Sequence, residues 1–137
     1  MRIMAIDYGD AHTGIAISDP TGFLAGTTTT IHARKAEVVL EELRKLVEQY
    51  KVEELVMGFP RNMDGTEGPR ADLYREFAGK VEEATGLKPV LWDERRTTID
   101  AHQILFNSGK NAKKRKKVVD AVAASLILEG YLAFRKR

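Results

Sequence analysis

Cysteine is absent from this 137-residue sequence, and histidine and tryptophan are scarce, with three and one residues. Without cysteine the chain can form no disulfide, no thiolate metal site and no cysteine nucleophile, which fits a reducing compartment. No apolar run approaches the roughly 18 residues that a membrane-spanning helix needs, and the first residues do not resemble a signal peptide. The sequence therefore predicts a cytoplasmic protein without a membrane partner.

Internal repeats, low-complexity segments and linkers are also lacking, so we expect a single domain over residues 1–137. The formal net charge of +2 conceals an asymmetry along the chain. Residues 1–91 carry 11 Lys and Arg against 15 Asp and Glu, whereas residues 92–137 carry 11 against 5. The basic second part indicates a polyanionic partner, although a solvated helix face is the more common reason for a basic run.

The first third of the chain predicts three strands. Residues 2–6 and 14–18 are short apolar runs separated by a polar turn, so we expect them to pair as an antiparallel hairpin. Residues 24–31 follow Pro20 and Gly22 and are rich in threonine, which predicts a third strand near a sheet edge. These three strands would form a meander.

The rest of the chain alternates between helical and extended patterns. Right-handed crossovers would make its two strands parallel to the first strand. The predicted fold is therefore α/β, with a mixed five-stranded sheet (a three-stranded antiparallel meander plus two parallel strands) flanked by helices. The expected later elements are a helix from about residue 34 to Tyr50, a strand at 54–58, a helix through Leu73–Ala84 that stops at Gly86, a strand at 89–92, and helices at 97–107 and 118–132.

Acidic residues fall where such sheets bind ligands, at the carboxyl ends of the strands. Asp7 ends the first strand, Asp93 and Glu94 follow the fifth, and Asp120 lies in a helix that is apolar almost all round. Taken singly, each acid has a structural explanation: an Asx-turn, a helix dipole, or an ion pair with Arg95. A lone charge in an apolar helix nevertheless needs a partner or a metal ion.

Taken together, these acids predict a metal site. If the last helix packs beside the first strand, carboxylates from three distant segments meet in an all-oxygen cluster suited to Mg²⁺ or Mn²⁺. Metal ions held in this way activate water and stabilise the leaving oxygen of a phosphodiester, so no protein nucleophile is required. The sequence therefore favours a nuclease.

Basic residues that could bind a nucleic acid lie near the same edge. A run of five precedes Asp120, and the alternative for this run is a solvated loop. Arg61 lies in a glycine- and proline-rich loop that could instead be only a long turn. His12 is a candidate substrate contact, whereas we expect core or surface roles for His32 and His102, and packing for Trp92. The basic run consists of Lys113, Lys114, Arg115, Lys116 and Lys117.

Four segments together resemble the YqgF family of RuvC-like proteins, a family associated with Holliday junction resolution and with nucleases that finish the 5′ end of 16S rRNA. The resemblance extends from Arg2 to about Leu132 and implies a ribonuclease H-like fold. It also implies catalytic and metal-binding roles for Asp7, Glu94 and Asp120, with nucleic-acid contacts at Gly9 and Arg95. The segments read AIDYGDAHTGIAISD, MGFPRNMDGTEGP, WDERRTTIDAHQIL and KKRKKVVDAVAASLILEGYL.

The sequence departs from the family pattern in three respects. His12 stands where arginine is common, so the contact of the first turn with substrate is expected to differ. Arg96 stands where an apolar residue is common. The acids number three rather than the four of fuller RuvC-type resolvases, because Ala124 and Ser125 occupy the region of a further carboxylate, and this weakens the junction-resolving assignment.

Four functions remain open from the sequence. The first is a metal-dependent nuclease that acts on structured RNA, specifically precursor 16S rRNA in a pre-ribosomal particle. The second is Holliday junction resolution on branched DNA, which needs a symmetric dimer; a monomer or a homodimer fits the chain. The third is a non-catalytic RNA-binding assembly factor. The last is an actin-like ATPase or sugar kinase, which shares the DYGDAHTG type of turn but needs two such domains.

Overall fold

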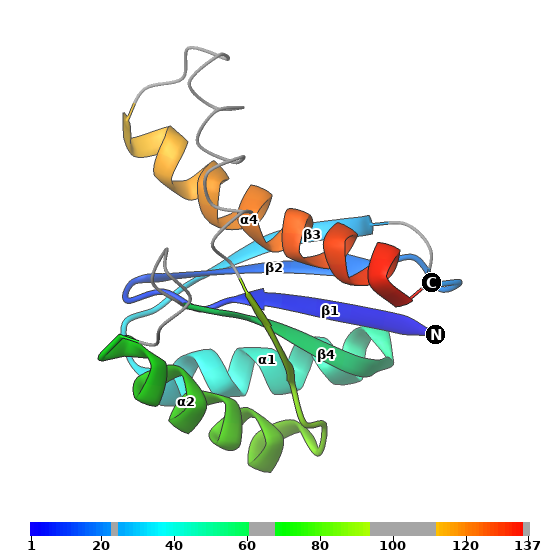
Figure 1. The fold of residues 1–137 in the computed structure, drawn as a ribbon, viewed down its shortest axis with the longest axis horizontal. Helices are drawn as coiled ribbons and strands as arrows, with labels where there is room; N and C mark the ends of the chain where they lie inside the picture. The colour runs from blue at the N-terminus through cyan, green and yellow to red at the C-terminus, as the bar shows by residue number, and fades with distance from the viewer. Residues whose placement is uncertain (23–24, 61–67, 94–111, 136–137) are drawn as a thin grey trace.

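The computed structural model describes residues 1–22, 25–60, 68–93 and 112–135, with backbone alone for residues 112–121. A five-stranded sheet forms the middle layer, with α1 and α2 covering one face and α4 the other (Figure 1). The strands are β1 (Arg2–Asp7), β2 (His12–Ser18), β3 (Ala25–His32), β4 (Val52–Phe59) and β5 (Val90–Asp93), and the helices are α1 (Ala36–Tyr50), α2 (Arg70–Thr85) and α4 (Ala112–Arg135).

The sheet has the strand order β3-β2-β1-β4-β5. β1, β2 and β3 form an antiparallel meander, with Asp7 opposite Gly14 and His12 opposite His32. β4 pairs with β1 in parallel, and β5 pairs with β4 in parallel. The predicted mixed sheet is confirmed, as is the position of the threonine-rich strand at an edge.

Two apolar cores lie on opposite faces of the sheet, because successive side chains of a strand point to opposite sides. Met4 and Ile6 of β1 belong to the core under α1 and α2. Ile3 and Ala5 belong to the core under α4. All four side chains are completely buried, and burial of a large aliphatic side chain stabilises the fold by about 1.5–3 kcal/mol. This alternation determines which layer each residue at the end of β1 faces.

One stripe of α4 packs on the sheet. Its buried residues Ala124, Ile127 and Tyr131 are spaced by three and four positions, the spacing of a helix face. Tyr131 Oη donates a 2.6 Å hydrogen bond to Glu54 Oε1, and Arg135 Nε lies 3.3 Å from Glu54 Oε2. Burial, helped by the bond to Glu54, raises the pKa of Tyr131 to about 12. The last turns of α4 are thus fixed to the beginning of β4.

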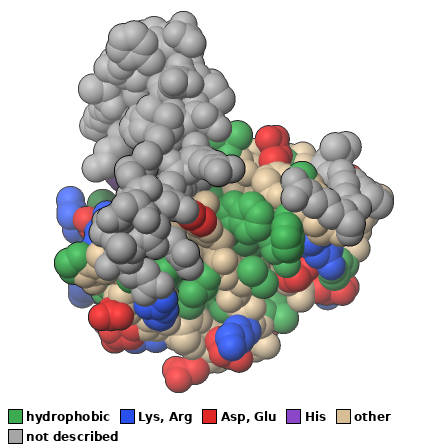
Figure 2. All heavy atoms as spheres, in the orientation of Figure 1, with side chains coloured by type: hydrophobic (Ala, Val, Ile, Leu, Met, Phe, Trp, Pro, Cys, Tyr) green, Lys and Arg blue, Asp and Glu red, His purple; other side chains and the backbone are tan. Residues whose placement is uncertain are grey.

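Trp92 connects the end of β5 to the same helix. Its ring lies edge-on to Tyr131 and Phe134, with centroid separations of 5.8 Å in both pairs. A Cβ atom at Gly130 would lie 3.3 Å from Trp92 Cζ2, so the indole occupies the space that glycine leaves free. Figure 2 shows hydrophobic side chains gathered over this junction of α4 and β5. The prediction that Trp92 packs against the protein is confirmed.

The boundaries of several elements differ from those predicted. β2 begins at His12 rather than at residue 14, and β3 includes His32. α4 begins at Ala112, six residues before the predicted start at 118, so the basic positions 113–117 belong to the helix. The predicted helix at 97–107 lies outside the described residues. In the described part of the chain, no helix has the length and apolarity needed to cross a membrane.

The packing of α4 generates a first prediction. Ile127 is fully buried against the sheet, whereas its neighbour Leu126 is partly exposed. Ile127→Ala should lower the free energy of unfolding by about 2–4 kcal/mol, since it leaves a cavity, and Leu126→Ala by about 1 kcal/mol or less. Urea unfolding curves compare the two variants. Equal losses would contradict this orientation of α4.

Candidate active site

The carboxyl ends of β1, β4 and β5 lie at one end of the sheet, and the first half of α4 lies at the same end (Figure 1). We call this end of the sheet, where these strands stop, the rim. Asp7, which ends β1, is half-buried at the rim. Because it follows Ile3 and Ala5 at two-residue spacing, Asp7 stands on the α4 face of the sheet. Asp93 ends β5 and follows Trp92, which packs on α4, so the pleat directs Asp93 to the opposite face.

Only part of the predicted site falls within the described residues. Asp7, Gly9 and His12 are described in full. Asp120 and the basic positions 113–117 lie in α4 and are described by their backbone. Glu94, Arg95 and Arg61 lie outside the described residues. Among the residues that are described, no group of three His, Asp or Glu side chains could hold a metal ion, and the joining of Asp7, Glu94 and Asp120 stays a prediction.

Gly9 lies in the turn between β1 and β2. A Cβ atom at this position would collide with the backbone carbonyl oxygen of His12. The turn can therefore bring β2 back beside β1 only with glycine at position 9. This contact gives Gly9 a structural role, while its predicted contact with nucleic acid stays untested.

An aromatic cluster from α2 holds the residue that follows Asp7. Tyr74 Oη donates a 2.7 Å hydrogen bond to the carbonyl oxygen of Tyr8, and Arg70 Nη2 donates a 2.9 Å bond to Tyr74 Oη. The Tyr8 ring stacks on Phe77 with a centroid separation of 3.7 Å. Burial, and the nearby Asp10 carboxylate, raise the pKa of Tyr8. The cluster anchors the backbone of the rim directly beside Asp7.

His12 and His32 form a pair on the neighbouring strands. They are partners in the β2–β3 register, and their Nδ1 atoms are 2.9 Å apart. Their rings lie at 83° to each other, with centroids 5.0 Å apart. His12 follows the same alternation as Gly14, the partner of Asp7, so the pair lies on the same face of the sheet as Asp7. His32 thus has a polar role at the rim, which the sequence had not indicated.

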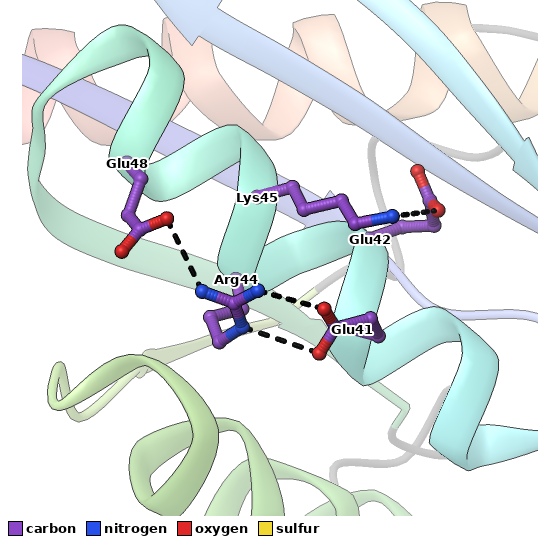
Figure 3. Close-up of polar contacts among 5 residues, drawn as sticks. All are labelled: Glu41, Glu42, Arg44, Lys45 and Glu48. Atoms are coloured by element: carbon purple, nitrogen blue, oxygen red, sulfur yellow. Dashed lines mark hydrogen bonds and ion pairs between the residues drawn. The ribbon is translucent and has the colours of Figure 1, made fainter.

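Cations on the outer face of α1 are bound by carboxylates of the same helix (Figure 3). Arg44 contacts Glu41 at 2.7 Å and Glu48 at 3.1 Å, and Lys45 lies 3.5 Å from Glu42. The hydrogen bond from Arg44 holds the pKa of Glu41 below its usual value. This face therefore presents a nearly neutral, ion-paired surface and is a poor candidate for binding a polyanion.

Charges on α2 follow the same pattern away from the rim. Arg75 lies 3.8 Å from Asp72, and Lys80 lies 3.5 Å from Glu76. Arg70, at the start of the helix, instead donates to the neutral hydroxyl of Tyr74 and lies over its ring, 5.3 Å from the centroid. No carboxylate in the described part of the chain pairs with Arg70, so its guanidinium could meet an anionic substrate at the rim.

Comparison with known sequences bears on the activity of this site. Residues 1–134 match the family described as "RuvX: Holliday junction resolvase". A protein from Carboxydothermus hydrogenoformans is 43% identical over 137 residues, which are 100% of this chain and 99% of its own. A protein from Clostridium botulinum is 48% identical over 132 residues, 96% of each chain. Both relatives bear the name "Putative pre-16S rRNA nuclease".

Two solved structures share the fold over the whole chain. RuvC from T. thermophilus, in complex with a Holliday junction substrate, gives a TM-score of 0.59 at 14% identity and covers 99% of this chain and 96% of its own. Fowlpox virus resolvase, bound to Holliday junction DNA, gives a TM-score of 0.60 at 14% identity and covers 100% of both chains. These likenesses confirm the predicted ribonuclease H-like fold.

The Tyr74 hydrogen bond generates a second prediction. Tyr74→Phe keeps the ring packing but removes the donor to Tyr8, so the turn after Asp7 should open more often. We expect faster amide hydrogen exchange at Gly9 and Asp10, together with a loss of about 1 kcal/mol in the free energy of unfolding. Tyr50→Phe is the matched control, because Arg2 binds the backbone carbonyl of Tyr50. Unchanged exchange in Tyr74→Phe would show that the bond does not hold the turn.

Proposed function

The chain belongs to the RuvX (YqgF) family, and from this premise we propose that it is a divalent-metal-dependent nuclease that processes the 5′ end of precursor 16S rRNA. The observation that carries the proposal is the full-length identity of 43–48% to relatives named for that activity. The nuclease assignment also agrees with an acidic strand end at the rim. Sugar-kinase chemistry has no comparable support.

We assign the metal ion to Asp7, Glu94 and Asp120. Asp7 stands on the α4 face of the sheet, at the rim. Position 120 precedes Ala124 by four residues and Ile127 by seven, so the helical period assigns it to the stripe that packs on the sheet. Glu94 lies outside the described residues and enters the assignment through the family resemblance. The placements of Asp7 and position 120 support one pocket between the sheet and α4.

The chemistry of these donors fits Mg²⁺ or Mn²⁺. Carboxylate oxygens are the ligands that hard divalent cations prefer, and the sequence offers no cysteine to compete. Metal ions bound there would activate water and stabilise the leaving oxygen of a phosphodiester. Asp7 would act as a carboxylate held in place by its turn, since Gly9 and the Tyr74 hydrogen bond fix the backbone on its carboxyl side.

Basic residues at the rim would bind the phosphates of the substrate. Positions 113–117 occupy the first turns of α4, whose first turn contains no acidic residue. Positive charges at a helix N-terminus oppose the helix dipole, so a phosphate partner would relieve an unfavourable arrangement. His12 and the backbone at Gly9 would add contacts from the rim, and we propose further contacts from Arg61 and Arg95, which lie outside the described residues. The ion-paired outer faces of α1 and α2 leave this surface as the better one for a polyanion.

Holliday junction resolution is the second candidate, because the family description names it. It requires two active sites on opposite strands and therefore a symmetric dimer. A non-catalytic RNA-binding factor is the third, and measured cleavage separates it from the first. In either RNA function the chain would work in the cytoplasm on a pre-ribosomal particle. Sedimentation together with cleavage of a synthetic four-way junction distinguishes the candidates: a monomer that cuts precursor rRNA and spares junctions supports the first.

The metal assignment generates the third prediction. Asp7→Asn, Glu94→Gln and Asp120→Asn should each lower Mg²⁺- or Mn²⁺-dependent cleavage by about 100-fold or more, since each removes a charged ligand. Cleavage of end-labelled precursor 16S rRNA measures the loss. Asp93→Asn is the matched control, because the pleat of β5 directs Asp93 to the other face. Wild-type turnover in excess EDTA would contradict the metal dependence.

The basic start of α4 generates the fourth prediction. Lys114→Gln combined with Lys117→Gln should weaken binding to single-stranded RNA and reduce the slope of log affinity against log salt by about 1.4, or about 0.7 for each phosphate contact. Fluorescence anisotropy at several salt concentrations measures the slope. Arg44→Gln combined with Lys45→Gln removes the same charge from the ion-paired face of α1 and should leave the slope unchanged. Equal effects of the two pairs would argue against α4 as the binding surface.

A further inference from the structure

The contact between His12 and His32 requires a hydrogen atom on one of the two Nδ1 atoms. Two imidazole nitrogens at 2.9 Å must share one hydrogen, so one Nδ1 donates and the other accepts. In the neutral pair one Nε2 carries hydrogen and the other carries a lone pair. One added proton goes to the free Nε2, and the Nδ1 contact survives. The singly protonated pair then presents two Nε2–H donors and one positive charge, whereas a second added proton would break the contact.

A phosphodiester is the ligand that matches this set. It carries one negative charge and two non-bridging oxygens that accept hydrogen bonds, the complement of one positive charge and two donors. A bound transition metal would need further ligands, and the described residues contain no group of three His, Asp or Glu side chains suited to a metal ion. Both rings are accessible, since His12 is half-buried and His32 is exposed.

The pair lies beside the position proposed for cleavage. His12 is two residues from Gly14, the β2 partner of Asp7, so His12 is a diagonal neighbour of Asp7 on the adjacent strand, and such neighbours lie about 7–8 Å apart. This distance is comparable to the spacing of successive phosphates in a nucleic-acid strand. Because the pair and Asp7 share one face of the sheet, a strand bound with one phosphate at Asp7 could place the next phosphate at the histidines.

We propose that His12 and His32 together form a subsite for the phosphate next to the scissile one, and that the subsite binds tightly only when the pair carries its extra proton. The inference rests on the proposed nuclease function and adds His32 to the substrate-binding residues. An imidazole gains its charge between about pH 5 and 8, so substrate affinity should fall as the pH rises through that range.

Other charged groups lie in the elements next to the pair. Asp7 at the end of β1 and Asp10 in the first turn favour the protonated pair. Arg34 and Lys35, directly after β3, oppose it, as do the basic positions 113–117 of α4, the helix packed on this face, which also contains position 120. These charged groups also act on an anion bound beside the pair. A substitution in the pair must therefore be compared with wild type over the whole pH range.

The test measures binding of a fluorescein-labelled ten-nucleotide RNA by anisotropy from pH 5.5 to 8.5, in excess EDTA, where metal-dependent cleavage does not occur. His32→Gln and His12→Gln should each weaken binding at pH 6 by about ten-fold, the size of a charge-assisted hydrogen bond, and have little effect at pH 8.5. The double variant should lose no more RNA affinity than either single variant, because the two histidines act as a unit. Thr29→Gln is the matched control: Thr29 is exposed on β3 but belongs to the opposite face.

Several results would overturn the proposal. Wild-type affinity at pH 6 in both single variants would exclude the subsite, and independent, additive losses would exclude a shared proton. Binding of Zn²⁺ that needs both histidines, with RNA affinity unchanged in the variants, would make the pair a metal site. If the wild-type protein cleaves no RNA, the nuclease function is refuted but the phosphate subsite is not, because the binding assay does not depend on turnover. Where cleavage occurs, His32→Gln should raise KM and leave kcat unchanged.

Discussion

The close approach of α4 to the middle of the sheet is the constraint on which the rim depends. Ala5 of β1, Ala16 of β2 and Ala124 of α4 are completely buried at this contact. Small side chains on both sides let the helix lie near the strands, and Ile127 fills the remaining space. Once this stripe faces the sheet, its continuation toward the start of α4 includes position 120, on the face of the sheet where Asp7 stands.

The two layers around the rim have different tasks. On one face, α2 holds the turn after Asp7 through Tyr74 and through the stacking of Tyr8 on Phe77. On the other, α4 carries the basic positions and position 120. Trp92 fits against Gly130 and so fixes the end of β5 to the helix. An acid on β1 thus has a rigid backbone on its α2 side and a potential binding surface on its α4 side, as a preorganised site requires.

Sequence patterns predicted the sheet well because its signals are local. The apolar runs, the threonine-rich edge and the change of period at residue 34 need only a few neighbouring residues to be interpreted. The predicted start of α4 was wrong because the basic run was interpreted by its charge, although Ala, Lys and Arg are among the strongest helix formers. The start at residue 112 could have been predicted if the helix propensity of these residues had been given more weight than the solvation of their charges.

The missed side-chain contacts depend on long-range geometry. Tyr74 and Tyr8 are 66 positions apart, and only the packing of α2 on the sheet brings them together. The pairing of His12 with His32 depends on the β2–β3 register, which is shifted by an irregularity between Ile17 and Ser18. A hairpin predicted without that shift would put His32 opposite a different residue. The acid cluster is still harder to predict from the sequence, because it requires three elements to be placed correctly relative to one another.

The rim can carry two kinds of positive charge, and they differ in what controls them. Lysine and arginine on α4, and Arg70 on α2, are charged at any physiological pH, whereas the histidine pair is charged only when it takes up a proton. The sequence resembles a family in which arginine is common at the position of His12, so the pair would replace a permanent charge with a conditional one. A nucleic-acid strand that crosses the rim from α4 to β3 would then be bound by α4 at any physiological pH, and by the histidine pair only when the pair is protonated.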